Sequence, residues 1–177
     1  AARSDRVFED GRTFSYRLAA EVSITQNDVR AIQLAKGALY AGFRLLMDHL
    51  EIDSVDRVIL AGAFGSHIDT KYAMVLGMVP DCPLDKVWSV GNAAGTGARI
   101  ALLDGDARRE IERVVRDVEK IETAVEPRFQ EHFVEAMAIP HKTAPYTLLR
   151  SAVNLPEPTF ANAGRQTAGR RRRRRNG

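Results

Sequence analysis

The sequence predicts an α/β fold, and two kinds of segment carry this prediction. Short apolar runs typical of buried strands, at residues 57–61 and 86–90, alternate with segments of helical periodicity. Each run passes directly into a stretch rich in glycine and alanine. Loops at the carboxyl ends of parallel strands are the usual ligand site of α/β sheets, so both stretches are candidates for binding.

The first part of the chain predicts a β-hairpin followed by one long helix. Residues 7–19 hold two β-prone runs around an Asp-Gly turn dipeptide. Thr25 suits the N-cap of the helix, and Asp28 stands three residues later as its partner in a variant capping box. Apolar residues then keep helical spacing as far as Leu50.

The rest of the chain continues the alternation. Trp88 lies inside an apolar run and is expected in the core. A later helix carries one apolar stripe of Ile111, Val114, Val115 and Val118. The expected elements are a helix at 70–78 capped by Asp69 or Thr70, a buried strand at 86–90, a helix of small residues capped by Asn92, a further helix started by Asp104-Gly105-Asp106, a possible strand at 120–124 and a helix at 127–137.

Composition divides the chain into a leading hairpin region at 1–20, a lobe at 21–140, and a linker and tail at 141–177. From about residue 150 the composition favours a disordered C-terminal tail. The net charge of +3 comes from this tail, because seven of the 26 basic residues lie in residues 159–177, which contain no acid. The remaining 19 basic residues face 23 acidic ones, so composition shows no basic face on the folded part.

Composition also limits the partners and cofactors. The run Arg170–Arg175 could bind nucleic acid or anionic lipid through charge alone, but no aromatic residues interleave with it, and a solvated tail is the favoured interpretation. No apolar run approaches the roughly 20 residues that span a bilayer, so we expect no membrane association. The single cysteine, Cys82, excludes a disulfide framework or a four-cysteine metal site in these residues and indicates a cytoplasmic protein.

The two small-residue stretches, Gly62–Ser66 and Gly91–Gly97, offer backbone N–H groups and room for a ligand. Known phosphate fingerprints fail here. No lysine follows Gly97 as a Walker loop requires, and Ile100 stands where the dinucleotide fingerprint needs a third small residue. Close packing of a strand beneath a helix is the alternative explanation for one such loop, whereas two loops at equivalent strand ends favour a binding site.

Several stretches in order resemble a known family. The segments ITQNDVRAIQLAKGALYAG, LAGAFGSHID, VGNAAGTGARIALL and PRFQEHFVEAM look like the carboxy-terminal domain of the reductive activators of corrinoid-dependent methyltransferases. The resemblance implies a ribonuclease-H-like second lobe of the sugar kinase, Hsp70 and actin superfamily of ATPases, over roughly residues 20–140. It also implies ATP as the ligand, with Mg²⁺ held by a first lobe, and electrons from a [2Fe–2S] ferredoxin-type domain whose cysteines these residues lack.

The resemblance assigns nucleotide contacts by position. The adenosine motif falls on Gly62, Ala63, Phe64, Gly65 and Ser66, with Ala63 in place of the usual second glycine. The connector helix falls on Gly91, Asn92, Ala93, Gly95 and Gly97, and the long helix offers Gln33, Lys36 and Gly37 for adenine or ribose. A solvated lysine on an exposed face is the alternative for Lys36. We expect Gly65→Val to abolish nucleotide binding without unfolding the protein.

The resemblance implies that the complete protein is an ATP-dependent activator that returns an inactive corrinoid protein, its expected partner, from cob(II)alamin to cob(I)alamin. No carboxylate pair stands out as a metal or general-base site, so we name no catalytic residue and expect this chain alone to be inactive. The alternatives are a non-catalytic interaction or dimerisation domain of the same fold, which includes a homodimer, and a lobe of an acetate-kinase-like or hydantoinase-like relative.

Overall fold

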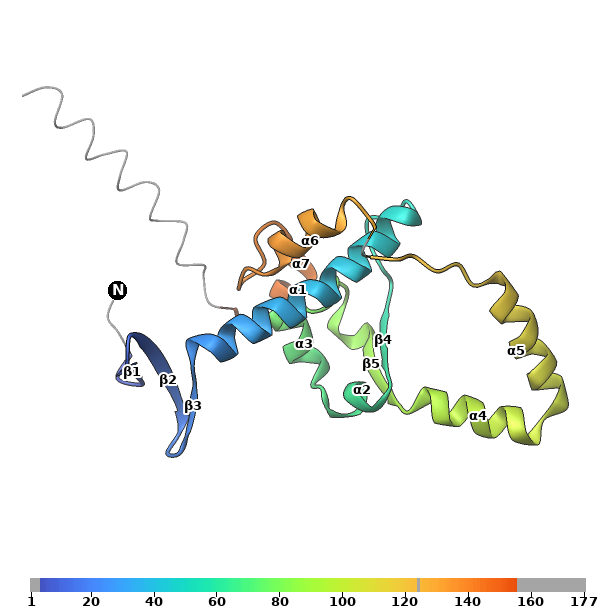
Figure 1. Cartoon of the computed structure of the whole chain (residues 1–177), viewed down its shortest axis with the longest axis horizontal. Coiled ribbons are helices and arrows are strands. Elements are labelled where there is room, and N and C mark those ends of the chain that lie inside the picture. The colour runs from blue at the N-terminus through green and yellow to red at the C-terminus, as the bar shows by residue number, and fades with distance from the viewer. Residues whose placement is uncertain (1–3, 124, 156–177) are drawn as a thin grey trace, which may run out of the picture.

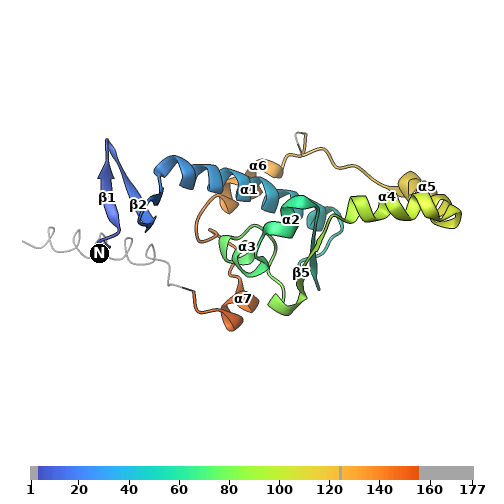
Figure 2. The same ribbon diagram turned by 90° about the horizontal axis from the view of Figure 1, so that it is seen from below.

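The computed structural model describes residues 4–123 and 125–155 of the 177-residue chain. Figure 1 shows the long helix α1 running through the molecule, with the strands β1–β3 at one end and helices α4 and α5 at the other. Helix α6 and the strands β4 and β5 lie on opposite sides of α1 (Figures 1 and 2). The element order is β1 (Val7–Asp10), β2 (Thr13–Ala19), β3 (Val22–Ile24), α1 (Gln26–His49), β4 (Val58–Ala61), α2 (Ala63–His67), α3 (Thr70–Leu76), the 3₁₀ turn η1 (Leu84–Lys86), β5 (Val87–Gly91), α4 (Ala93–Leu103), α5 (Gly105–Asp117), α6 (Phe129–Ala136) and α7 (Thr147–Ala152).

The hairpin predicted at residues 7–19 is confirmed, and a third strand extends it. β1 pairs antiparallel with β2, and β2 pairs antiparallel with β3, so that Tyr16 stands opposite Ile24. Ser15 is buried in this small sheet, and its hydroxyl donates to the carboxylate of Asp10 at 3.0 Å. The strand at residues 22–24 was not predicted, because three residues are too few to show an alternating pattern.

Helix α1 begins as predicted, immediately after Thr25. The hydroxyl of Thr25 accepts the backbone N–H of Asp28 at 3.3 Å, and the carboxylate of Asp28 accepts the backbone N–H of Thr25 at 2.8 Å. This reciprocal pair is a complete capping box. The hydrogen bonds from Thr25 favour the charged carboxylate and hold the pKa of Asp28 below its usual range. The start of the longest helix is therefore determined by contacts within four residues of sequence.

A charged cluster around Asp48 joins α6 to α1. The carboxylate of Asp48 lies 2.6 Å from Nε2 of His132, 2.9 Å from Arg128 and 3.2 Å from Arg44. His132 is buried in this contact. The helix expected at 127–137 is thus confirmed as α6, and it contacts α1 through polar as well as apolar side chains.

Strands β4 and β5 pair in parallel, with Val58 opposite Val87 and Ala61 opposite Gly91. The connection between them is split into two helices. The short α2 follows β4 directly, and α3 is capped by Asp69, as predicted, through a 3.2 Å hydrogen bond from the N–H of Tyr72. Parallel strands joined through helices make the predicted α/β arrangement.

The core lies between α1, the β4–β5 pair and the segment that follows α6. The hydroxyl of Tyr146 donates to the carbonyl of Val79 at 2.8 Å, and the carboxylate of Asp81 accepts the backbone N–H groups of Leu148 and Leu149 at the start of α7. Residues 141–155 therefore pack into the domain and differ from the linker that we expected. The predicted disordered tail beyond them lies outside the described residues. The buried core cluster is Tyr40, Val58, Met74, Val79, Cys82, Val87, Ala136, Tyr146 and Leu149.

The opposite side of the molecule carries exposed apolar side chains. Trp88, which we expected in the core, is 42% exposed, because no element covers the side of β5 on which it lies within the described residues. The apolar stripe predicted on α5 forms, but it too is exposed. No strand forms at residues 120–123, since Ile121 and Thr123 lie beside α1 instead of beside a strand. Among residues 4–123 and 125–155, no helix has the length and apolar character that a membrane span requires.

Candidate functional site

The two predicted small-residue loops meet at the carboxyl ends of β4 and β5. The backbone N–H of Gly62 donates to the carbonyl of Gly91 at 2.5 Å, and the hydroxyl of Ser89 donates to the carbonyl of Gly65. Gly91 has a φ of 63°, and a Cβ built there would lie 3.4 Å from Oγ of Ser66. The prediction that the loops occupy equivalent strand ends is confirmed by this register.

Three of the predicted glycines lie in close packing, and at Gly65 the neighbour is backbone. A Cβ on Gly65 would lie 2.8 Å from the carbonyl oxygen of Leu60, so α2 rests directly on β4. A Cβ on Gly95 would lie 2.6 Å from the side chain of Asn92, which caps α4 by accepting the Gly95 N–H at 2.9 Å. A Cβ on Gly37 would crowd helix α6. The side chain of Gly65→Val would meet the backbone of Leu60, so we expect this variant to lower stability, and it does not test nucleotide binding alone.

Gly62 and Gly97 face open space. Within the described residues, no atom lies within 4 Å of a Cβ built on either glycine. Gly62 has a φ of 101°, which disfavours any residue with a side chain, and Gly97 lies in the second turn of α4. Ala63 and Ala93 are exposed and add little more than backbone at the starts of α2 and α4, and of Phe64 only the backbone is described. The result is a bare wall that a flat group could approach closely.

These residues do not fit a metal centre. The loop residues 62–66 and 91–97 contain no carboxylate for Mg²⁺. Within the part of the chain that the structure describes, no group of three His, Cys, Asp or Glu side chains could hold a metal ion. Cys82 is buried in the core, and burial raises the pKa of its thiol. A [2Fe–2S] cluster takes four protein ligands, so these residues do not form its site.

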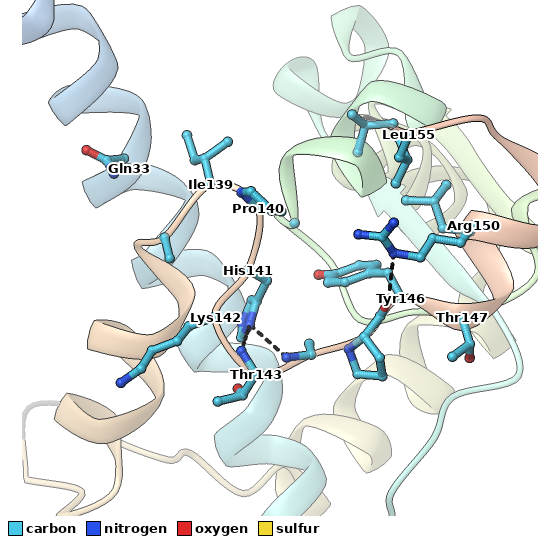
Figure 3. A pocket seen from close by; sticks show the side chains of 16 residues that line it. Gln33, Ile139, Pro140, His141, Lys142, Thr143, Tyr146, Thr147, Arg150 and Leu155 are labelled. Carbon is cyan, nitrogen blue, oxygen red and sulfur yellow. Dashed lines mark hydrogen bonds between the residues drawn. The ribbon is translucent and has the colours of Figure 1, made fainter. Parts of the chain in front are cut away.

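The remaining candidates, Gln33 and Lys36, lie elsewhere. Gln33 lines a cavity of about 850 Å³ between α1 and residues 138–150, which Figure 3 shows from close by. No residue of the two loops lines this cavity. Lys36 is only 1% exposed, so it is not the solvated lysine of the alternative explanation. Burial lowers the pKa of its ammonium group to about 8.

The same cavity is lined by His141 and Tyr146, which sequence reasoning missed. Nδ1 of His141 accepts the backbone N–H groups of Thr143 at 3.3 Å and Ala144 at 3.0 Å. Burial lowers the pKa of this imidazole to about 4, and burial also raises the pKa of the Tyr146 hydroxyl. The segment HKTAPY has no periodicity that would mark it as part of a packed site. The structure thus divides the predicted contacts between two places.

Comparison with known proteins agrees with this architecture. Residues 1–149 match the family model described as the C-terminal domain of RACo, the ASKHA domain. The chain belongs to this family. The chain is 40% identical over 116 residues to the corrinoid activation enzyme RamQ of Eubacterium limosum, a match that covers 64% of the chain and 20% of RamQ. It also matches a solved structure of a reductive activator for corrinoid, iron–sulfur protein, with a TM-score of 0.67 and 33% identity over 77% of the chain.

The ASKHA domain described here spans about a fifth of the length of these relatives, with 20% of RamQ and 23% of the solved chain covered. The resemblance that the sequence segments carried is confirmed, and with it the second-lobe fold of the sugar kinase, Hsp70 and actin superfamily. The nucleotide contacts of individual residues stay predictions.

Proposed function

We propose that this ASKHA domain forms the second lobe of a nucleotide cleft in an ATP-dependent reductive activator of corrinoid proteins. The family match and the likeness to the corrinoid activation enzyme RamQ support the proposal. The observation that carries it is the hydrogen bond from Gly62 to Gly91, which joins two glycine loops into one surface at the ends of parallel strands.

The adenosine part of ATP suits this surface. Adenine is flat and uncharged, so it needs close approach of backbone and open space more than it needs a cationic side chain. Gly62 and Gly97 provide such space, because neither has an atom near the position of its missing Cβ within the described residues. The phosphates and Mg²⁺ would be held by the first lobe, since the loops contain no carboxylate.

The electron would come from a [2Fe–2S] domain that these residues do not form. Reduction of cob(II)alamin to cob(I)alamin is uphill, so closure of the two lobes around ATP would be coupled to it. In this scheme the chain binds the nucleotide and moves as one wall of the cleft, and none of its residues transfers an electron. The corrinoid protein is the partner of the complete activator.

Gly97→Val tests whether the surface at Gly62 and Gly97, here called the nucleotide wall, contacts ATP. Valine fits the open side of α4 without meeting other residues, so the free energy of unfolding should stay within about 0.5 kcal/mol of the wild type. The branched side chain would stand where adenosine approaches. We expect the affinity of the complete activator for ATP, measured by calorimetry, to fall at least tenfold.

Gly42→Val is the matched control, because Gly42 is also a helical glycine with no atom within 4 Å of its Cβ position, but it lies on α1. It should leave ATP affinity unchanged. Equal ATP affinity in wild type and Gly97→Val would reject the assignment of this surface to the nucleotide.

A non-catalytic interaction domain is the second candidate, and the exposed apolar side of β5 favours it. Trp88 and Val90 lie uncovered there, two residues apart on the same strand. If the complete protein fails to bind ATP at millimolar concentration, while Trp88→Ser abolishes its association with a corrinoid protein, this second function replaces the first.

A further inference from the structure

The cavity between α1 and residues 138–150 is a candidate for a second ligand site. It measures about 850 Å³ and lies apart from the two glycine loops. Figure 3 shows His141 and Tyr146 at its centre, with Gln33 on the side of α1 and Arg150 on the side of α7. Its sixteen lining residues include Lys142 and Arg150 but no aspartate or glutamate, so the charge of its wall is positive.

A buried ammonium group lies directly behind this wall. Nζ of Lys36 has no hydrogen-bond partner within the described residues, although the residue is 1% exposed. It lies 3.3 Å from the position of a Cβ on Gly77, and the hydroxyl of Tyr146 lies equally close to that point. Both Gly77 and Tyr146 line the cavity. A buried cation without a partner is unfavourable, so this arrangement calls for an acceptor that the described chain does not supply.

His141 supplies a second donor without an acceptor. Its Nδ1 accepts two backbone N–H groups, so the proton of the neutral ring is on Nε2. That Nε2 atom is buried and has no hydrogen-bond partner in the part of the chain that the structure describes. The carboxylate that influences His141 is Glu135 of α6, which bonds Thr143 instead and does not line the cavity.

Arg150, on α7, is the third donor side chain at this cavity. Its Nε donates to the carbonyl of Pro145 at 3.1 Å, and no carboxylate pairs with its guanidinium within residues 4–123 and 125–155. Two of the three donor side chains, His141 and Arg150, thus line one cavity, and the third, Lys36, lies behind its wall at Gly77. Buried and unpaired N–H donors with excess positive charge are what an oxyanion requires.

We propose that this cavity binds the phosphate or carboxylate group of a small molecule, with Lys36 and the Nε2–H of His141 as its buried donors and Arg150 at its rim. This site is separate from the nucleotide wall at Gly62 and Gly97, and its occupant is a molecule other than the ATP of the proposed function. An anion there would give both buried donors the acceptor they lack. It would also tie α1 to the segment 138–150.

The test titrates the purified chain, at pH 7 in a buffer without oxyanions, with inorganic phosphate in one series and acetate in another. Binding is followed by the NMR signals of the His141 ring and by calorimetry. We expect one of the two anions to bind with a dissociation constant below about 10 mM and to shift the His141 signals. Phosphate binding identifies a phosphate ester as the ligand class, and acetate binding identifies a carboxylate.

Lys36→Met removes the ammonium and keeps the length of the side chain, and it should weaken anion binding at least tenfold. Arg150→Gln leaves the buried donors in place and should weaken it about threefold. Lys71→Met removes an exposed lysine on α3 and should change nothing. Absence of binding by both anions, or equal binding by wild type and Lys36→Met, would overturn the proposal.

The two proposals fail separately. Gly97→Val should retain anion binding in this cavity while it loses ATP, and Lys36→Met should retain ATP binding by the complete activator while it loses the anion. If Lys36→Met abolishes both, the cavity belongs to the nucleotide site and the separate oxyanion site is rejected.

Discussion

The two sides of this domain differ in which side chains they bury. On the side of α1, α6 and residues 139–155, even polar groups are buried, as Lys36 and His132 show. On the side of β5, α4 and α5, large apolar side chains such as Trp88 and Leu103 are exposed. Helices α4 and α5 pack mainly on each other and form an arm away from the core (Figure 1). The comparison teaches that an apolar stripe does not by itself define a core, because burial needs a partner surface.

Leucine deletions on the two sides should give the largest difference. Leu149 is 1% exposed in the core, so Leu149→Ala should lower the free energy of unfolding by about 3 kcal/mol through the cavity it leaves. Leu103 is 83% exposed on α4, and Leu103→Ala should change it by less than about 0.5 kcal/mol. Urea denaturation of the full chain measures both. Equal losses would mean that the α4–α5 arm is covered in solution.

The helix caps and the two glycine loops were predictable from the sequence, but the exposure of β5 was not. The Thr25–Asp28 capping box, the Asp69 and Asn92 caps and the two glycine loops need only neighbouring residues, and the structure contains all of them. Which face of β5 has a partner is a tertiary property, so the apolar run around Trp88 predicted a core that did not form around it. The packing of residues 141–155 left no periodic trace, because Tyr146 and Leu149 hydrogen-bond to Val79 and Asp81, which are distant in the sequence.

The candidate site was predictable to a similar extent. Glycine at 62 and 97 marks open backbone, but glycine at 65 and 95 marks close packing, and the sequence pattern is the same for both. At Gly65 the difference lies in the distance to the backbone of Leu60, which the packing of α2 on β4 determines, whereas at Gly95 it comes from the neighbouring cap Asn92. Burial of Lys36 could not be inferred either, since a lysine in a helical pattern is usually solvated.

The next largest difference in stability is expected between a closely packed glycine, Gly65, and an open one, Gly97. Gly65→Val would place a side chain against the backbone of Leu60, and we expect it to lower the free energy of unfolding by about 2 kcal/mol. Gly97→Val, on the open side, should be close to neutral. Guanidinium denaturation with far-UV circular dichroism gives both values. A neutral Gly65→Val would show that α2 can lift from β4 at no cost.

Lys36→Met should stabilise the protein, because it removes a buried charge from the packed side. The pKa of Lys36 is lowered from 10.5 to about 8 in the folded state, so the folded protein binds this proton less tightly than the unfolded chain does. The charged ammonium therefore lowers the free energy of unfolding in full below pH 8, and this loss disappears above pH 10.5. At pH 7, without oxyanions, the variant should unfold with a free energy about 1–2 kcal/mol higher than the wild type. This gain should shrink as the pH rises from 8 to 10.5, whereas Lys71→Met should show no gain at any pH.

The smallest expected effects come from removing one helix cap on each side of the domain. Thr25→Ala removes the capping box of α1, on which the core is built, and should lower the free energy of global unfolding by about 1 kcal/mol. Asp104 caps α5 by accepting the N–H groups of Asp106 at 2.8 Å and Ala107 at 3.2 Å. Asp104→Ala should leave global unfolding unchanged, because α5 makes little contact with the core, and should speed amide hydrogen exchange within α5 alone. If Asp104→Ala also lowers global stability by about 1 kcal/mol, the arm folds cooperatively with the core. The contrast between a packed and an open side would then apply to side-chain exposure but not to the folding of the domain.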